Sequence, residues 1–223
     1  MNLFIGDSLG LPSMGYGVRY EDTVPHCLAD GDGVWMLAHT GATVTELKDV
    51  VLEMSRLLPY HFYDMAVIYV GLADCAPRPI AHEWRHQIST MRNTRLRRFI
   101  IKFLHKFRPF IQKYIGFYQR TSKKSFSESL RRLYFLTAMI SKKVVCIMIP
   151  PVRESMERQS PRISEQITEY NGCVARLAPM VKAAVIDARA ELGSDPLRYL
   201  TDDGHLTVDG NAIVINKLKE ILK

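Results

Sequence analysis

Short apolar runs recur along the chain, each rich in β-branched residues and bounded by turn-forming residues. Such runs are typical of strands that are buried on both faces within a parallel sheet. The pattern predicts five strands, at residues 2–5, 33–39, 65–72, 143–151 and 183–188.

The segments between these runs carry apolar residues at helical spacing. Residues 43–58 begin with a threonine in a capping position, and similar apolar stripes span 163–181 and 207–222. Alternating strands and helices imply right-handed crossovers, which place helices on both faces of one parallel sheet. We therefore predict the α/β class, as a three-layer α/β/α sandwich with a central parallel five-stranded sheet.

The segment 82–140 departs from this alternation, because it is far longer than an ordinary connection between a strand and a helix. In the stretch RLRRFIIKFLHKFRPFIQKYIGFY, apolar residues follow helical spacing and basic residues fill the other face, and Pro109 is expected to kink or divide the helix. A second helix, at about 126–140, would return the chain to the fourth strand. We predict one domain over residues 1–223, with a basic amphipathic helical hairpin inserted at 82–140.

The charge of the chain is concentrated in this insert. Hydrophobic residues make up 47% and charged residues 24% of the chain, as in a soluble globular protein. Residues 85–143 hold 16 lysines and arginines and a single acidic residue, Glu128, whereas the remaining chain holds 14 basic and 22 acidic residues. The net charge of +7 therefore describes one segment and not the whole surface.

Three interpretations of the basic insert stay open. It is a solvated face on a hairpin that packs against the body, a cap that binds an anionic glycan or a nucleotide-linked substrate, or an interfacial helix that lies on anionic lipid. The expected contact through residues 85–143 is thus with an anionic membrane surface or a polyanionic glycan. The segment has no recognisable nucleic-acid-binding fold, so no nucleic-acid partner is expected.

The cysteines and the first residues of the chain give an expectation about the cellular location of the protein. Four scattered cysteines, at positions 27, 75, 146 and 173, form no paired motif and indicate reduced thiols. The sequence has no secretory signal pattern and no apolar run long enough for a transmembrane helix. We expect a cytoplasmic protein, with a peripheral position on the inner face of the membrane as a variant of that expectation. No metal-ligand spacing is present, so neither a metal nor a cofactor is expected.

Ligands of open α/β sheets bind at the carboxyl ends of the strands, so the turns there are the candidates for chemistry. Ser8 follows the first strand in GDSL, Gly41 follows the second in HTGAT, and the late segment YLTDDGHLTVDGNA contains Asp202 and His205. A serine becomes a nucleophile when a histidine takes its proton and a carboxylate orients that histidine. Asp202 and His205 are close enough to share one loop, and the N–H groups of Ser8 and Gly41 are candidates for holding an oxyanion.

GDSLG also matches the G-x-S-x-G nucleophile elbow of the α/β-hydrolases. In that fold the elbow follows several strands, and the acid and the histidine lie on separate loops. Here Ser8 follows the first strand, and the candidate acid and base share one short loop. The position of the motif therefore argues against an α/β-hydrolase.

Together these motifs resemble the SGNH/GDSL hydrolase family, whose sandwich is flavodoxin-like. GDSL resembles the first block of the family, which implies Ser8 as the nucleophile, and HTGAT resembles the second, which implies Gly41 as an oxyanion donor. DDGHLT resembles the block that supplies the acid, here Asp202, and the base, here His205. The resemblance covers the chain from end to end apart from the helical insert.

One block departs from the family pattern, which is usually Gly-x-Asn-Asp with the asparagine amide donating to the oxyanion. This chain has GLAD, in which Gly71 and Asp74 match but Ala73 replaces the asparagine. Losing such a donor costs roughly 3 kcal/mol of transition-state stabilisation. Arg78 is the candidate replacement. Asp7, Asp74 and Arg78 are assigned to substrate binding, although Asp74 is as well suited to joining loops by hydrogen bonds.

The resemblance implies a serine esterase that removes a small acyl group, an O-acetyl group above all, from a carbohydrate through an acyl-enzyme, without a cofactor. GDSLGLP and YEDT together with GLADCAPR also resemble a subgroup linked to bacterial surface-polysaccharide biosynthesis. Two alternatives stay open. One is an O-acyltransferase that passes the acyl group to a sugar hydroxyl, and the other is a glycan- or membrane-surface-binding module that has lost catalysis.

Overall fold

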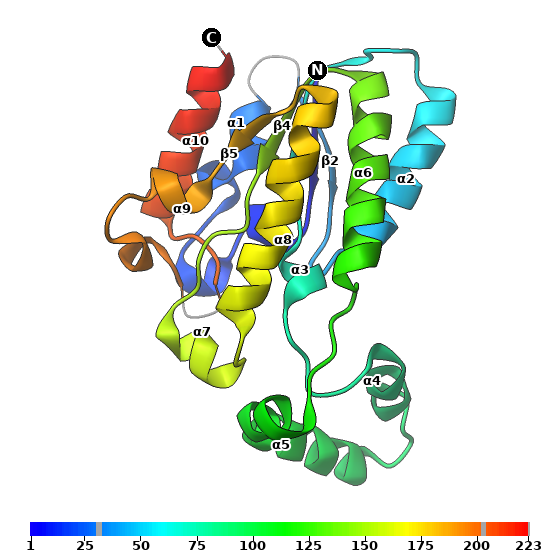
Figure 1. Ribbon diagram of the computed structural model, residues 1–223, viewed down its shortest axis with the longest axis vertical. Coiled ribbons are helices and arrows are strands. Elements are labelled where there is room, and N and C mark those ends of the chain that lie inside the picture. Colours follow the sequence, from blue (N-terminus) through cyan, green and yellow to red (C-terminus); the bar gives the residue numbers. More distant parts are fainter. Residues whose placement is uncertain (30–32, 202–203, 223) are drawn as a thin grey trace.

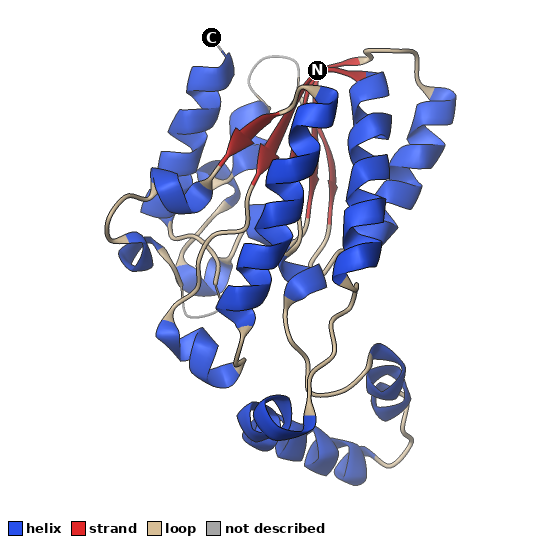
Figure 2. Ribbon diagram, in the orientation of Figure 1, coloured by secondary structure: helices blue, strands red, loops and turns tan. Residues whose placement is uncertain are grey.

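A computed structural model describes residues 1–29, 33–201 and 204–222, and its centre is one five-stranded sheet (Figures 1 and 2). The strands run parallel in the order β2-β1-β3-β4-β5. Their bounds are β1 Asn2–Gly6, β2 Val34–Ala38, β3 Tyr63–Tyr69, β4 Ser141–Ile147 and β5 Ala184–Ile186. The predicted α/β class and the five predicted strands are confirmed.

Helices cover both faces of this sheet (Figure 1). One layer consists of α2 Val44–Leu57, α6 Lys123–Ile140 and α8 Ile163–Leu177, and the other includes α1 Val24–Leu28 and α10 Val208–Leu222. The central strands β1 and β3 are almost completely buried between the layers, as their continuous apolar runs predict. The remaining helical segments are η1 Ser8–Gly10, η2 Met14–Tyr16, η3 Tyr20–Asp22, α3 Leu72–Cys75, α4 His82–Ser89, α5 Thr94–Phe110, η4 Ile111–Ile115, α7 Glu154–Gln159, η5 Ala178–Val181, α9 Ala188–Glu191 and η6 Pro196–Tyr199.

The N-terminus of α2 is fixed by a capping box, which the sequence predicts from Thr43. The Thr43 hydroxyl accepts a hydrogen bond from the Glu46 N–H, and the Glu46 carboxylate accepts one from the Thr43 N–H at 2.7 Å. This reciprocal pair fixes the end of the loop after β2 at Thr43. Gly41 lies in that loop, two residues before Thr43.

The insert between β3 and β4 contributes a protruding lobe, residues 79–117, which contains α4, α5 and η4 (Figure 1). At its base the backbones of Arg78 and Tyr118 exchange two hydrogen bonds, of 2.8 and 2.9 Å. The return helix of the predicted hairpin, α6, packs on the body against α2 rather than on the lobe. The α-helical part of α5 ends one residue after Pro109, and the chain continues as a π-helical turn.

Candidate active site

The turns after β1, β2 and β3 meet at one edge of the sheet. Gly6, the last residue of β1, is in register with Ala38 at the end of β2 and with Tyr69 at the end of β3. The turns that follow contain Ser8, Gly41 and the GLAD segment. The strand register thus brings three of the predicted motifs to neighbouring positions at the carboxyl edge.

The turn that carries Ser8 is organised by the buried carboxylate of Asp7. Oδ1 of Asp7 accepts the Leu9 N–H at 2.9 Å, and Oδ2 accepts the N–H groups of Gly71 at 3.2 Å and Ala73 at 3.4 Å. Burial raises the pKa of Asp7, and these three hydrogen bonds oppose that rise. Ser8 itself is half-buried at the start of η1. One carboxylate therefore ties the serine turn to the turn after β3.

The two glycines of GDSLG are explained by the ring of Phe4. A Cβ atom at Gly6 would lie 2.5 Å from the ring of Phe4, and a Cβ atom at Gly10 would lie 2.1 Å from it. The ring is completely buried in the core, so it has no room to move aside. The two glycines of GDSLG therefore leave room for the buried ring of Phe4, which lies on β1.

His205 is presented by a tight loop that closes on Thr201. The Thr201 N–H donates to the His205 carbonyl at 2.8 Å, and the His205 N–H donates to the Thr201 hydroxyl at 3.1 Å. His205 is half-buried, and its electrostatic interaction with Asp7 lowers the pKa of that carboxyl. Because Asp7 adjoins Ser8, the loop brings the predicted base toward the predicted nucleophile. The predicted acid, Asp202, lies outside the described residues.

Gly41 adopts a left-handed backbone conformation, with φ of +76°. Its carbonyl accepts a hydrogen bond from the guanidinium of Arg120, which also forms an ion pair with Glu46 at 3.5 Å. A Cβ atom at Gly41 would lie 3.2 Å from Nη1 of Arg120. Arg120 therefore anchors the peptide between Gly41 and Ala42, and the left-handed conformation of Gly41 relates it to the preceding peptide, which carries the Gly41 N–H.

Asp74, the last residue of GLAD, is fully buried and joins two loops. Its carboxylate accepts the N–H of Val44, the first residue of α2, at 3.1 Å, and it also accepts a hydrogen bond from the Thr121 side chain. Burial and the nearby charge of Asp7 raise the pKa of Asp74 to about 7, although its hydrogen bonds and Arg120 act in the opposite direction. These contacts match the loop-joining role considered for Asp74. Its role in substrate binding stays a prediction.

Ala73 occupies the position where the family pattern has its asparagine. The residue is buried, and its N–H points to Asp7 at 3.4 Å. A methyl side chain has no donor, so the turn after β3 supplies no side-chain amide at this position.

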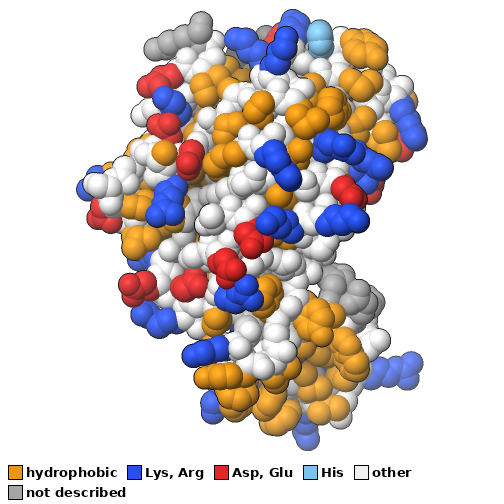
Figure 3. Space-filling view, viewed as in Figure 1, with side chains coloured by type: hydrophobic (Ala, Val, Ile, Leu, Met, Phe, Trp, Pro, Cys, Tyr) orange, Lys and Arg blue, Asp and Glu red, His pale blue; other side chains and the backbone are white. Residues whose placement is uncertain are grey.

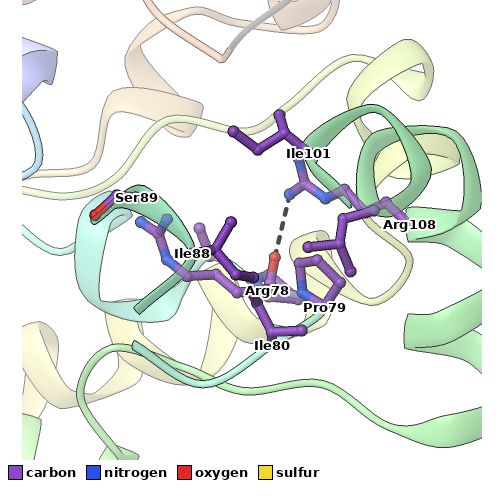
Figure 4. A pocket seen from close by; sticks show the side chains of 10 residues that line it. Arg78, Pro79, Ile80, Ile88, Ser89, Ile101 and Arg108 are labelled. Atoms are coloured by element: carbon purple, nitrogen blue, oxygen red, sulfur yellow. Dashed lines mark hydrogen bonds between the residues drawn. The ribbon is translucent and has the colours of Figure 1, made fainter. Parts of the chain in front are cut away.

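Arg78, the predicted replacement donor, lies at the base of the lobe. It lines a cavity of about 440 Å³ together with Arg108 and apolar residues of the lobe, and Arg108 donates to the Pro77 carbonyl at 3.1 Å (Figure 4). Among the described residues, the cavity wall includes neither Ser8 nor His205. The structure therefore associates Arg78 with the cavity under the lobe. The full wall is Ala76, Pro77, Arg78, Pro79, Ile80, Ile88, Ser89, Ile101, Leu104 and Arg108.

The family assignment follows from a comparison over nearly the whole chain. Residues 4–213 match the GDSL-like lipase/acylhydrolase family. The chain belongs to this family. As a member of the GDSL-like family, it is an SGNH-type ester hydrolase, and the resemblance predicted from its motifs is confirmed.

Solved structures of GDSL-type proteins share the fold, at low sequence identity. A lipolytic GDSL-family protein from Veillonella parvula superposes with a TM-score of 0.59 at 14% identity, covering 99% of this chain and 96% of that chain. An acetylxylan esterase from Geobacillus stearothermophilus gives 0.58 at 18% identity, covering 99% and 93%. A carbohydrate acetylesterase from Sinorhizobium meliloti gives 0.59 at 16% identity, covering 99% and 97%. No curated protein matches this sequence.

Sequence reasoning missed Arg120 and Thr121 in this GDSL-family chain. Both follow the lobe and precede α6, and they reach Gly41 and Asp74 only through the tertiary fold. Arg120 is separated from Gly41 by 79 positions, so no local periodicity or motif marks it. The one available signal was its place in a basic segment that returns to the body.

Proposed function

We propose that the protein is a serine esterase that removes a small acyl group from an acylated carbohydrate. The observation that supports the proposal is that Ser8 stands at the carboxyl end of β1, while His205, from a distant loop, interacts electrostatically with the adjoining Asp7. Ser8 as nucleophile and His205 as base would follow the division of roles in serine hydrolases.

In the proposed mechanism, Ser8 Oγ attacks the ester carbonyl carbon while His205 takes the serine proton. The tetrahedral intermediate collapses, the carbon–oxygen bond to the sugar breaks, and His205 returns the proton to the departing sugar hydroxyl. Water then attacks the acyl-serine while His205 takes its proton. The carbon–oxygen bond to Ser8 breaks, the carboxylic acid leaves, and His205 returns the proton to Ser8 Oγ. Asp202 would orient His205, and the N–H groups of Ser8 and Gly41 would hold the oxyanion. The left-handed φ of Gly41, together with the Arg120 hydrogen bond that anchors the following peptide, supports a restrained N–H donor at that position.

The substrate class is proposed from the family and from the printed names of structural neighbours. Two of these are an acetylxylan esterase and a carbohydrate acetylesterase. An O-acetyl group on a sugar, in a surface-polysaccharide precursor, is the corresponding substrate for this chain. Arg78 and the cavity beside it are our candidate for binding an anionic part of such a precursor.

The same site could act as an O-acyltransferase if a sugar hydroxyl replaced water, and a binding module would use the site without chemistry.

We also propose a cytoplasmic location. Its support is that all four cysteines are free thiols, and three of them are buried. An anionic membrane surface is the proposed partner of the basic segment 85–143, in preference to a polyanionic glycan.

Acyl transfer to Ser8 is tested with an activated acetyl ester and a fluorophosphonate probe. We expect wild-type protein to hydrolyse the ester and to carry the probe on Ser8, as read by mass spectrometry of peptides. Ser8→Ala should abolish both, and the matched control Ser13→Ala, on the same loop, should retain both. Absence of wild-type turnover and labelling would leave the binding module as the better description. Acetyl transfer to an added sugar in preference to water would identify a transferase.

A further inference from the structure

The lobe carries a stripe of large apolar side chains that points away from the body of the molecule. Along α5 and η4 they recur every three or four residues, which places them on one side of the helix. In the space-filling view, hydrophobic side chains gather over the lobe (Figure 3). The stripe consists of Leu96, Phe99, Phe103, Phe107, Phe110 and Tyr114, whose exposed fractions are 47%, 67%, 48%, 39%, 56% and 66%.

A different side of the same helix already holds the lobe on the body. Leu104 and Arg108 line the cavity at its base, and Arg108 donates to the Pro77 carbonyl. The buried side chain of Gln112 donates to the same carbonyl at 2.8 Å. The interpretation in which the hairpin packs its whole apolar face on the body therefore leaves the aromatic stripe unexplained. Contiguous exposed apolar side chains of this size mark an interaction surface.

The remaining side of α5 is basic and adjoins the stripe. At 100° per residue, Arg95, Lys102 and Lys106 fall within about 60° of an aromatic side chain and on the side away from Leu104 and Arg108. Arg98 lies further round the same flank, and Lys113 of η4 is a fifth exposed cation. No acidic residue occurs anywhere in 85–127, so the sequence supplies no opposing charge within the segment. The five cations are Arg95, Arg98, Lys102, Lys106 and Lys113.

We propose that this face of the lobe docks onto the surface of an anionic lipid bilayer. The aromatic stripe enters the boundary between headgroups and acyl chains, and the adjoining cations contact the lipid phosphates. A polyanionic glycan would use the cations but would leave the phenylalanines in water. A second copy of the chain would bring two basic flanks together. No helix in the described part of the chain is long and apolar enough to cross a bilayer.

The test uses the full-length protein and flotation with two kinds of vesicle, pure phosphatidylcholine and phosphatidylcholine mixed with phosphatidylglycerol. We expect binding to the anionic vesicles only, and loss of binding in high salt. Arg98→Gln with Lys102→Gln should reduce the apparent affinity severalfold. Phe99→Ser with Phe103→Ser should reduce it about tenfold or more, because burial of each ring in lipid is lost.

Matched controls remove equally exposed side chains elsewhere. Leu57→Ser with Tyr60→Ser, at the end of α2 and the following turn, and Arg131→Gln with Arg132→Gln, on α6, should leave vesicle binding unchanged. Circular dichroism and thermal melting establish that each variant is folded.

Three outcomes would overturn the proposal. Wild-type protein that does not float with anionic vesicles at low salt excludes lipid docking. Binding that the paired phenylalanine variant leaves unchanged, and that soluble dextran sulfate displaces, indicates affinity for polyanions instead. A dimer in analytical ultracentrifugation that this variant dissociates, without vesicle binding, identifies a second copy as the occupant.

Discussion

At the scale of single residues, the candidate site depends on groups that act through the backbone. Asp7 holds N–H groups of two turns, and Arg120 holds the carbonyl of Gly41. Neither interaction places a side chain on the predicted nucleophile. Asp7 orients the N–H groups that it accepts, and Arg120 anchors the peptide after Gly41, which restrains the peptide that carries the Gly41 N–H. Such restraint matters for an oxyanion hole because its donors must be oriented before the charge develops.

Arg120 is therefore predicted to be a positioning residue. Arg120→Ala removes the donor on the Gly41 carbonyl, so kcat for an acetyl ester should fall about tenfold, less than the loss of a whole oxyanion donor. KM should change little, because the peptide is reoriented without removing a substrate contact. Arg120→Lys should recover part of the loss. Arg131→Ala, on the exposed side of α6, is the control, and an unchanged kcat in Arg120→Ala would contradict the role.

The places of Ser8 and Gly41 could be predicted from sequence because each lies in a turn after a strand, whose position follows from strand order. The catalytic roles of Ser8, Gly41 and His205 stay predictions. The place of Arg120 could not be predicted, since its contact arises only when the end of the insert returns beside α2. Arg78 illustrates the opposite case. It was predicted as the replacement donor, and the structure places it in the wall of the cavity under the lobe, so its role in the oxyanion hole stays a prediction.

At the scale of secondary-structure elements, the N-terminus of α2 is held by two carboxylates. Glu46 completes the capping box, and Asp74 accepts the N–H of Val44. The capping box is a local pattern and was predictable from Thr43. The contribution of Asp74 is a contact across 30 positions, made by the turn after β3. The two interactions together connect the second and third motif-bearing turns.

The raised pKa of Asp74 gives this connection a pH dependence. Its folded-state pKa, about 7, lies above the usual 3.8, so folding favours the protonated form. That stabilisation is complete below about pH 4 and is lost as pH rises through 7. Between pH 5 and pH 8, wild-type protein should lose on the order of 3 kcal/mol more unfolding free energy than Asp74→Asn, because about two pH units separate pH 5 from the raised pKa. Urea titrations at pH 5 and pH 8 measure the difference, and parallel pH profiles for the two proteins would contradict it.

At the scale of the whole molecule, the lobe is an insertion into the α/β body, and the two chain segments that connect it, at Arg78 and Tyr118, lie side by side. The strands and the covering helices could be predicted from the apolar pattern. Strands buried between two helical layers need continuous apolar runs, and the covering helices need one apolar face. The insert was predicted as a hairpin over 82–140, but its return helix α6 belongs to the helical layer over the sheet. Apolar spacing does not reveal which surface a helix will contact, so this division required the tertiary structure.

The paired hydrogen bonds between Arg78 and Tyr118 predict that the lobe can be removed. Such an antiparallel pair can be closed by a two-residue turn, so residues 79–117 should be replaceable by Asn-Gly. The shortened protein should fold, react with a fluorophosphonate at Ser8 and hydrolyse a small soluble ester, while losing vesicle binding. The same deletion carrying Ser8→Ala is the control. A folded deletion variant without Ser8 reactivity would mean that the lobe completes the active site.

The buried carboxylate of Asp7 has a consequence for local motion. Its two oxygens hold amides from the turn after β1 and from the turn after β3, so neither turn can unfold locally without releasing an anchor of the other. The free energies of opening of the two turns are thus coupled. A substitution in the GLAD turn that disturbs its backbone should change the mobility of Ser8 without touching it, whereas the His205 loop is closed by its own contacts with Thr201.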